Sequence, residues 1–160
     1  MVRAFMCEFF YATRYAWLFT WGKIMQMEIM EAHDETTTLS YTVARIVYAE
    51  TLAKSLRVVE ALTSMIFNAA NHDIKNIKRV ISNSQMFESL KNESTRHEFL
   101  SVDASRRDFQ MCLRVAKTML HGNLPDTCCH ATMFHRGEFL PSWAVARGYI
   151  CDIDGILFYT

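Results

Sequence analysis

The chain has 160 residues, a length typical of one domain and sufficient to bury a core without disulfide bonds. Lys and Arg together number 17, as do Asp and Glu, so the formal net charge is zero and no long basic run is present to neutralise phosphates; nucleic acid is not an expected partner. Only 5 Gly and 2 Pro accompany 51% hydrophobic residues, which favours a mainly helical chain. The 5 cysteines lack the regular spacing of a disulfide framework, which favours reduced thiols.

The N-terminal segment is predicted to form an amphipathic helix over residues 3–29, because Phe5, Phe9 and Ala12 recur at helical spacing. No small-residue cleavage site follows it, so a cleavable signal peptide is not expected and an exported protein would need a non-classical route. The uncharged stretch 15–22 is shorter than the ~20 apolar residues of a membrane span. Three uses of the apolar face stay open: docking on the domain, peripheral membrane association and homodimer formation.

A polar stretch divides the chain into an N-terminal helix with linker, residues 1–35, and a domain over residues 36–160. The first helix of that domain is expected from residue 41 to about residue 52. Ser40 and Thr42 are both candidate N-caps, because short hydroxyl side chains accept a hydrogen bond from the first turn of a helix.

Three more helices are predicted from apolar residues at three- and four-residue steps. One covers residues 56–71 behind the N-cap candidate Ser55, and a short one lies near residues 74–81. The third begins at Ser105 and stops before Gly122.

Two short strands are expected near the C-terminus, over residues 132–135 and 155–159, joined through the segment 141–143. Residues 87–92 are expected to form a loop. The predicted fold class is therefore α+β, mainly α, with a small C-terminal β element.

One glutamate stands out as a candidate for chemistry. Glu50 ends the apolar segment 44–50, and a second apolar segment, 58–68, is expected to pack behind it. Burial against apolar neighbours favours the protonated form of a carboxyl group, as the general acid of glycoside cleavage requires. Tyr48 is expected to form part of that apolar wall.

These segments resemble the SleB-like cell-wall hydrolase family, whose signature runs Ala-Arg-x-x-Tyr-x-Glu and continues into an Ala/Val-rich helix that ends in Asn. The resemblance extends from residue 40 to residue 159. It implies a lysozyme-like helical core and cleavage of the glycan strands of peptidoglycan, without a cofactor or metal. The matching patches are residues 44–50, 59–68, 87–92, 130–135, 141–144 and 157–159.

The resemblance implies that Glu50 is the catalytic acid, and it supplies the remaining candidates. Glu60 is a candidate second carboxylate, although a glutamate on that helix is equally expected at the surface or beside Arg57. The candidate substrate-binding residues are Tyr48, Asn68, His135, Trp143 and Tyr159.

With one dependable acid, a lytic transglycosylase is the economical mechanism, because the muramoyl 6-hydroxyl replaces water as the nucleophile; hydrolysis stays open. The chain also departs from the family pattern. It has His130 where relatives commonly have glycine, Met133 where many have histidine, and Ile156 at a Gly-x-His step. These departures motivate a second hypothesis, a catalytically degenerate member that serves as a glycan-binding or membrane-associated scaffold.

Overall fold

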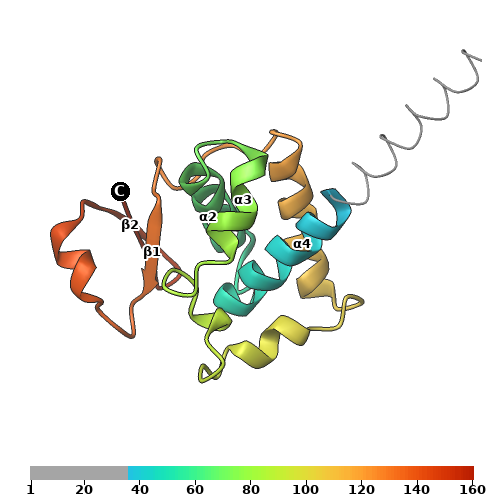
Figure 1. The fold of residues 1–160 in the computed structure, drawn as a ribbon, viewed down its shortest axis with the longest axis horizontal. Coiled ribbons are helices and arrows are strands. Elements are labelled where there is room, and N and C mark those ends of the chain that lie inside the picture. Colours follow the sequence, from blue (N-terminus) through green and yellow to red (C-terminus); the bar gives the residue numbers. More distant parts are fainter. Residues whose placement is uncertain (1–35) are drawn as a thin grey trace, which may run out of the picture. The chain divides into compact units, whose positions relative to one another are not determined.

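The structure, a computed structural model, describes residues 36–160 (Figure 1). The chain divides into two compact units, Met1–Thr38 and Leu39–Thr160, and the second is described below. The helix expected over residues 3–29, with its membrane and homodimer hypotheses, lies outside the described residues. Within residues 36–160, no helix combines the length and apolar character needed to cross a membrane.

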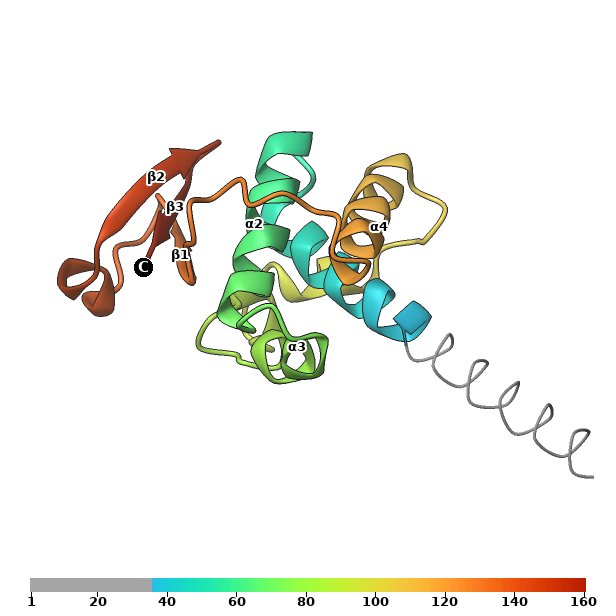
Figure 2. The same ribbon diagram turned by 90° about the horizontal axis from the view of Figure 1, so that it is seen from above.

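The helical part is built around α2 (Leu56–Ala69), which Figures 1 and 2 show between the C-terminal sheet and α4 (Arg107–Leu120). Almost the whole circumference of α2 is buried, as expected for a helix enclosed by other elements. The other helical elements are a helix over residues 36–51, α3 (Ile74–Ile81) and the 3₁₀ helices η1 (Glu88–Leu90), η2 (His97–Ser101) and η3 (Ser142–Ala146).

The predicted N-cap residue is confirmed for one helix and is wrong for two. Ser55 caps α2 as predicted, and its Oγ accepts a hydrogen bond from the Val58 N–H at 3.2 Å. Ser40 and Thr42 do not cap the preceding helix, because residues 36–38 are already helical and Ser40 is buried within it. The polar residues before them therefore extend that helix instead of breaking it.

Ser105 does not cap α4 either. The helix begins at Arg107, and Arg106 occupies the N-cap position without a side-chain cap. The Ser105 hydroxyl donates instead to Asp103 Oδ2 at 2.9 Å. A nearby carboxylate has therefore taken the hydroxyl that the sequence assigned to the helix start.

The C-terminal sheet has three antiparallel strands in the order β1-β3-β2: β1 (Met133–Arg136), β2 (Tyr149–Ile153) and β3 (Ile156–Tyr159). β1 and β3 were predicted, but β2 was not. Asp154 and Gly155 connect β2 to β3, with φ angles of +54° and +83°. Two successive positive φ angles are typical of a tight hairpin turn with an Asp-Gly sequence.

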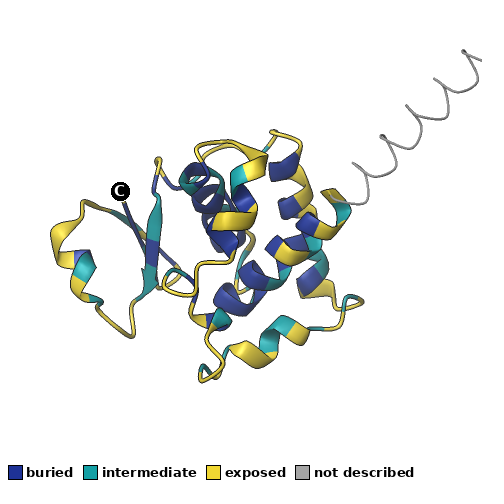
Figure 3. Cartoon of the chain, viewed as in Figure 1, coloured by how far each residue is buried: buried dark blue, intermediate teal, exposed yellow. Residues whose placement is uncertain are grey.

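The mainly helical domain with a small C-terminal sheet confirms the predicted α+β class. Its core combines side chains from the four α-helices of residues 36–160 with Phe87 and Phe158, all of them buried. The helical part accordingly carries much of the dark blue in Figure 3. By contrast, the connection from β1 to β2 is largely exposed in the same figure. The described residues thus form a densely packed helical body and an exposed connection between β1 and β2, residues 137–148, which is called the excursion below.

Candidate functional site

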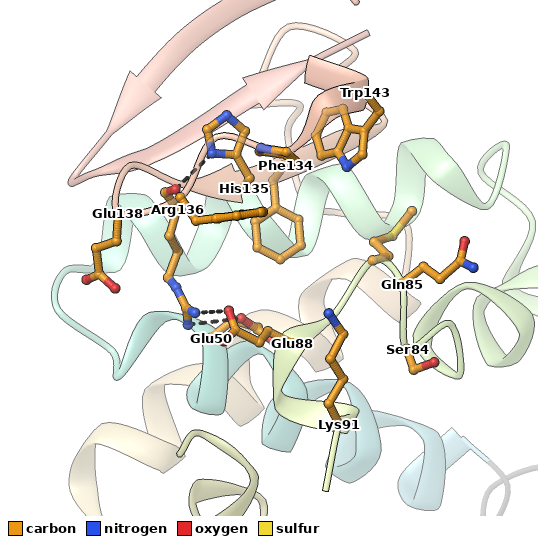
Figure 4. Close-up of a pocket in the computed structure, with 13 residues that line it drawn as sticks. Glu50, Ser84, Gln85, Glu88, Lys91, Phe134, His135, Arg136, Glu138 and Trp143 are labelled. Carbon is orange, nitrogen blue, oxygen red and sulfur yellow. Dashed lines mark hydrogen bonds and ion pairs between the residues drawn. The ribbon is translucent and has the colours of Figure 1, made fainter. Parts of the chain in front are cut away.

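An open cleft of about 680 Å³ lies between the helical body and the sheet (Figure 4). Its walls come from three stretches of the chain: the end of the helix over residues 36–51, the segment around η1, and β1 with the excursion that follows it. The lining residues are Glu50, Ser84, Gln85, Met86, Glu88, Lys91, Phe134, His135, Arg136, Glu138, Phe139, Pro141 and Trp143.

Glu50 occupies the last turn of the first described helix, and its side chain is only 1% exposed. Its Oε1 accepts a hydrogen bond from the Ser89 backbone N–H at 2.8 Å. Arg96 fixes the same turn, because its Nη1 donates to the carbonyls of Ala49 and Glu50 at 3.0 Å each. The position of Glu50 is thus fixed by hydrogen bonds to its backbone carbonyl and to one of its two carboxylate oxygens.

A guanidinium from the sheet forms an ion pair with the other carboxylate oxygen of Glu50, and its Nη1, which is buried, has no hydrogen-bond partner. Arg136 Nη1 lies 3.5 Å from Glu50 Oε2, and Arg136 Nη2 donates to Glu88 Oε2. The Arg136 side chain is 13% exposed, whereas that of Glu88 is half exposed. Figure 4 shows Arg136 reaching from β1 to both carboxylates. One cation therefore links two carboxylates across the floor of the cleft.

His135 and Trp143 form an aromatic cluster with Tyr159 beside the cleft. The His135 ring stacks on Tyr159 at a centroid distance of 5.2 Å, and the two side chains are also joined by a 3.0 Å contact between His135 Nε2 and the Tyr159 hydroxyl. Trp143 packs edge-on against both rings, at 5.8 Å and 5.5 Å. His135 and Trp143 line the cleft, while Tyr159 is buried behind them and supports their positions.

The structure does not bring Tyr48, Asn68 or Glu60 into the cleft. Tyr48 is buried and packs edge-on against Phe109 at 6.3 Å, because two residues along a helix turn a side chain about 200° away from Glu50. Glu60 is half-buried on α2 and is not part of the lining. Of the candidate residues, Glu50, His135 and Trp143 share the cleft.

Asn68 belongs to a separate cluster around Asp126. Its Nδ2 lies 3.4 Å from Asp126 Oδ1, which also accepts from Ser64 Oγ at 3.2 Å. Burial raises the pKa of Asp126, but hydrogen bonds from the backbone N–H groups of Cys128 and His130 outweigh that effect, so the pKa is lowered to about 2. The carboxylate anchors a loop that includes two residues with positive φ, Cys129 and His130.

Burial suppresses the reactivity of two cysteine thiols in the domain. Cys112, Cys128, Cys129 and Cys151 are all unpaired. Burial raises the pKa of both Cys112 and Cys128 to about 12, and Asp126 adds to the effect on Cys128. Among residues 36–160, no group of three or more His, Cys, Asp or Glu side chains is arranged to hold a metal ion.

Sequence reasoning missed Glu88 and Arg136, the two charged residues that contact each other beside Glu50. Residues 87–92 were expected to form a loop and carried no assigned chemistry, yet Glu88 begins η1 and Ser89 supplies the backbone donor to Glu50. The available signal for Arg136 was its position: it directly follows His135, the last residue of the strand predicted over residues 132–135. Comparisons with protein-family models, curated proteins and solved structures gave no match.

Proposed function

We propose that this cleft cleaves the glycan strands of peptidoglycan, with Glu50 as the general acid. The observation that supports the proposal is a nearly buried glutamate that nevertheless contributes to the floor of an open cleft with an aromatic side. In the proposal, a glycosidic oxygen bound in the cleft approaches this shielded carboxyl group. A lysozyme-like arrangement of the mainly helical domain with its small sheet belongs to the same proposal.

In the proposed reaction, Glu50 donates a proton to the leaving glycosidic oxygen as the bond to the anomeric carbon breaks. The resulting carboxylate then accepts the proton of the muramoyl 6-hydroxyl while that oxygen bonds to the anomeric carbon. The product is a 1,6-anhydro sugar, and no water is consumed. If water attacks instead, Glu88 is the second carboxylate to consider, because it lies in the cleft beside Glu50 and is half exposed.

Arg136 imposes a requirement on this mechanism. A general acid must hold a proton when the substrate arrives, whereas the guanidinium attracts the ionised carboxylate. For Glu50 to reach a glycosidic oxygen, Arg136 has to shift towards Glu88, with which it already forms a hydrogen bond. Glu88 therefore gives Arg136 a second partner when Glu50 turns to the substrate.

The same ion pair favours a second candidate function, a glycan-binding scaffold that has kept the cleft but not the reaction. In that case Arg136 neutralises Glu50 permanently, and the aromatic side chains of the cleft remain available to a saccharide. The two functions differ in one property, the release of soluble products from peptidoglycan.

The experiment is mass spectrometry of products released from purified peptidoglycan by the wild type, Glu50→Gln and Glu60→Gln. We expect 1,6-anhydro-MurNAc ends from the wild type and from Glu60→Gln, and a loss of about 100-fold or more in Glu50→Gln. Glu60 is the matched control, because it does not line the cleft.

Unchanged release by folded Glu50→Gln would contradict the proposed acid. Reducing MurNAc ends would mean that water is the nucleophile, and Glu88→Gln would be the next variant. A folded wild type that releases nothing but is retained by sacculi would favour the scaffold.

A further inference from the structure

Two adjacent residues at the start of η2, Arg96 and His97, hold the two ends of the hydrogen bond that Ser89 donates to Glu50. On the acceptor side, Arg96 Nη1 donates to the backbone carbonyl of Glu50 at 3.0 Å. On the donor side, His97 Nδ1 lies 2.9 Å from the backbone carbonyl oxygen of Ser89. Neither Arg96 nor His97 lines the cleft, so neither is placed to contact a substrate there.

The backbone that carries Glu50 needs such support, because the helix over residues 36–51 ends in a sharp turn. Leu52 and Ala53 have positive φ angles of +51° and +50°, a conformation that side chains of this kind rarely adopt. The carbonyls in the last turn of a helix also lack donors within the helix. Arg96 Nη1 donates to two of these carbonyls at 3.0 Å each, and it thereby stabilises an otherwise disfavoured turn.

His97 restricts the donor of the same hydrogen bond. A backbone carbonyl can only accept, so Nδ1 of His97 carries the proton and donates to the Ser89 oxygen. Ser89 is fully buried, and its amide donates to Glu50 Oε1 at 2.8 Å. With its carbonyl held, Ser89 has less freedom to turn that amide away from Glu50. The orientation of a buried donor therefore depends on an exposed histidine.

We propose that Arg96 and His97 are positioning residues for the reaction at Glu50. They keep Oε1 of Glu50 bound to the Ser89 amide, so that Oε2, which faces Arg136, donates the proton to the leaving oxygen and later accepts that of the muramoyl 6-hydroxyl. Misplacement of a reacting group by about 1 Å costs a rate factor of roughly 100. This inference rests on the proposed function for its reaction, but the hydrogen bond that it requires can be measured without a substrate.

The chain contains a matched control for each of the two residues. His121 is also exposed, and its Nδ1 lies 2.6 Å from the carbonyl oxygen of Lys117, but it follows α4 and does not line the cleft. Arg45 Nη1 donates to two carbonyls at the end of η2, at 2.7 Å and 3.1 Å. Arg45 thus joins the same helix to the same part of the chain as Arg96 does, without holding the turn at Glu50.

The first test is NMR hydrogen exchange of the Ser89 amide in the full chain, relative to buried amides of α2 that report global unfolding. We expect His97→Ala and Arg96→Ala to increase the exchange rate by roughly tenfold, because the amide no longer has a fixed acceptor. His97→Asn should retain most of the protection, since its side-chain amide places a donor close to the position of Nδ1. His121→Ala and Arg45→Ala should leave the relative rate unchanged.

The second test is the rate at which 1,6-anhydro products are released from purified peptidoglycan. We expect His97→Ala and Arg96→Ala to lower the apparent kcat by roughly tenfold with little change in KM, and His97→Asn to recover most of the rate. A variant that weakened only the fold would show no such recovery and would resemble the control His121→Ala.

The positioning role and the proposed function fail in different ways. Release by both alanine variants at the rate of their controls, or unchanged protection of the Ser89 amide in both, would overturn the positioning role and leave the function standing. A wild type that releases nothing would overturn the function. Loss of Ser89 protection in that inactive chain would still show that Arg96 and His97 hold Glu50 in place.

Discussion

Two carboxylates in this domain each gather distant parts of the chain, and their surroundings differ in kind. Asp126 accepts backbone N–H groups from residues two and four positions further along its own loop, and it does not line the cleft. Glu50 accepts one backbone N–H from η1 and faces a guanidinium from β1, and it does line the cleft. The first arrangement stabilises a loop and ties it to Ser64 and Asn68 of α2, whereas the second joins η1 to β1 and presents its charge to a ligand site.

The largest effect on stability is expected from Arg136→Gln. Removing the guanidinium leaves Glu50 nearly buried without its cation, so we expect the free energy of unfolding to fall by about 3 kcal/mol. The double variant Glu50→Gln/Arg136→Gln should regain part of that loss, because it removes the uncompensated charge as well. Urea denaturation of the four proteins in this cycle measures the coupling. Additive effects would show that the Arg136–Glu50 contact contributes nothing to stability.

A smaller effect is expected from Asp126→Asn, about 1.5 kcal/mol at pH 6, because charge-assisted hydrogen bonds to Cys128 and His130 become neutral ones. The effect should depend on pH with a defined sign. The folded pKa of about 2 lies below the ordinary aspartate value of 3.8, so the stabilisation is present above pH 4 and is lost as the pH falls towards 2. Chemical denaturation of both proteins from pH 6 to pH 2 should therefore show their stabilities converging, and a constant difference over that range would exclude this role for Asp126.

Helical periodicity predicted the body of the domain because its helices bury apolar faces against one another. The short helix near residues 74–81 and the cap at Ser55 followed from the same local signals. Errors arose at helix starts, where polar side chains had two partners to choose between. Ser105 donates to Asp103, and residues 36–38 continue a helix into which Ser40 is buried.

The sequence predicted only those residues of the candidate site that stand within a recognisable sequence segment. Glu50 was singled out from its apolar setting and from the resemblance, and His135 and Trp143 from the resemblance; the structure brings the three to one cleft. Glu88 and Arg136 were missed because their importance lies in a contact between η1 and β1, and charge pairing across such a distance leaves no periodic pattern. Tyr48 and Asn68 were attractive in sequence, but the former faces the core and the latter contacts Asp126.

The smallest predicted effect concerns the hairpin that sequence reasoning overlooked. Asp154-Gly155 lies between two apolar segments, and Asp-Gly in that position is a strong hairpin signal. Gly155 has a φ of +83°, so Gly155→Ala should destabilise the domain by about 1 kcal/mol through backbone strain. Gly137→Ala is the matched control, because a Cβ there meets Leu157 at an ordinary 3.5 Å and Gly137 has no positive φ. Equal thermal midpoints for the two variants would show that the turn does not constrain β2 against β3.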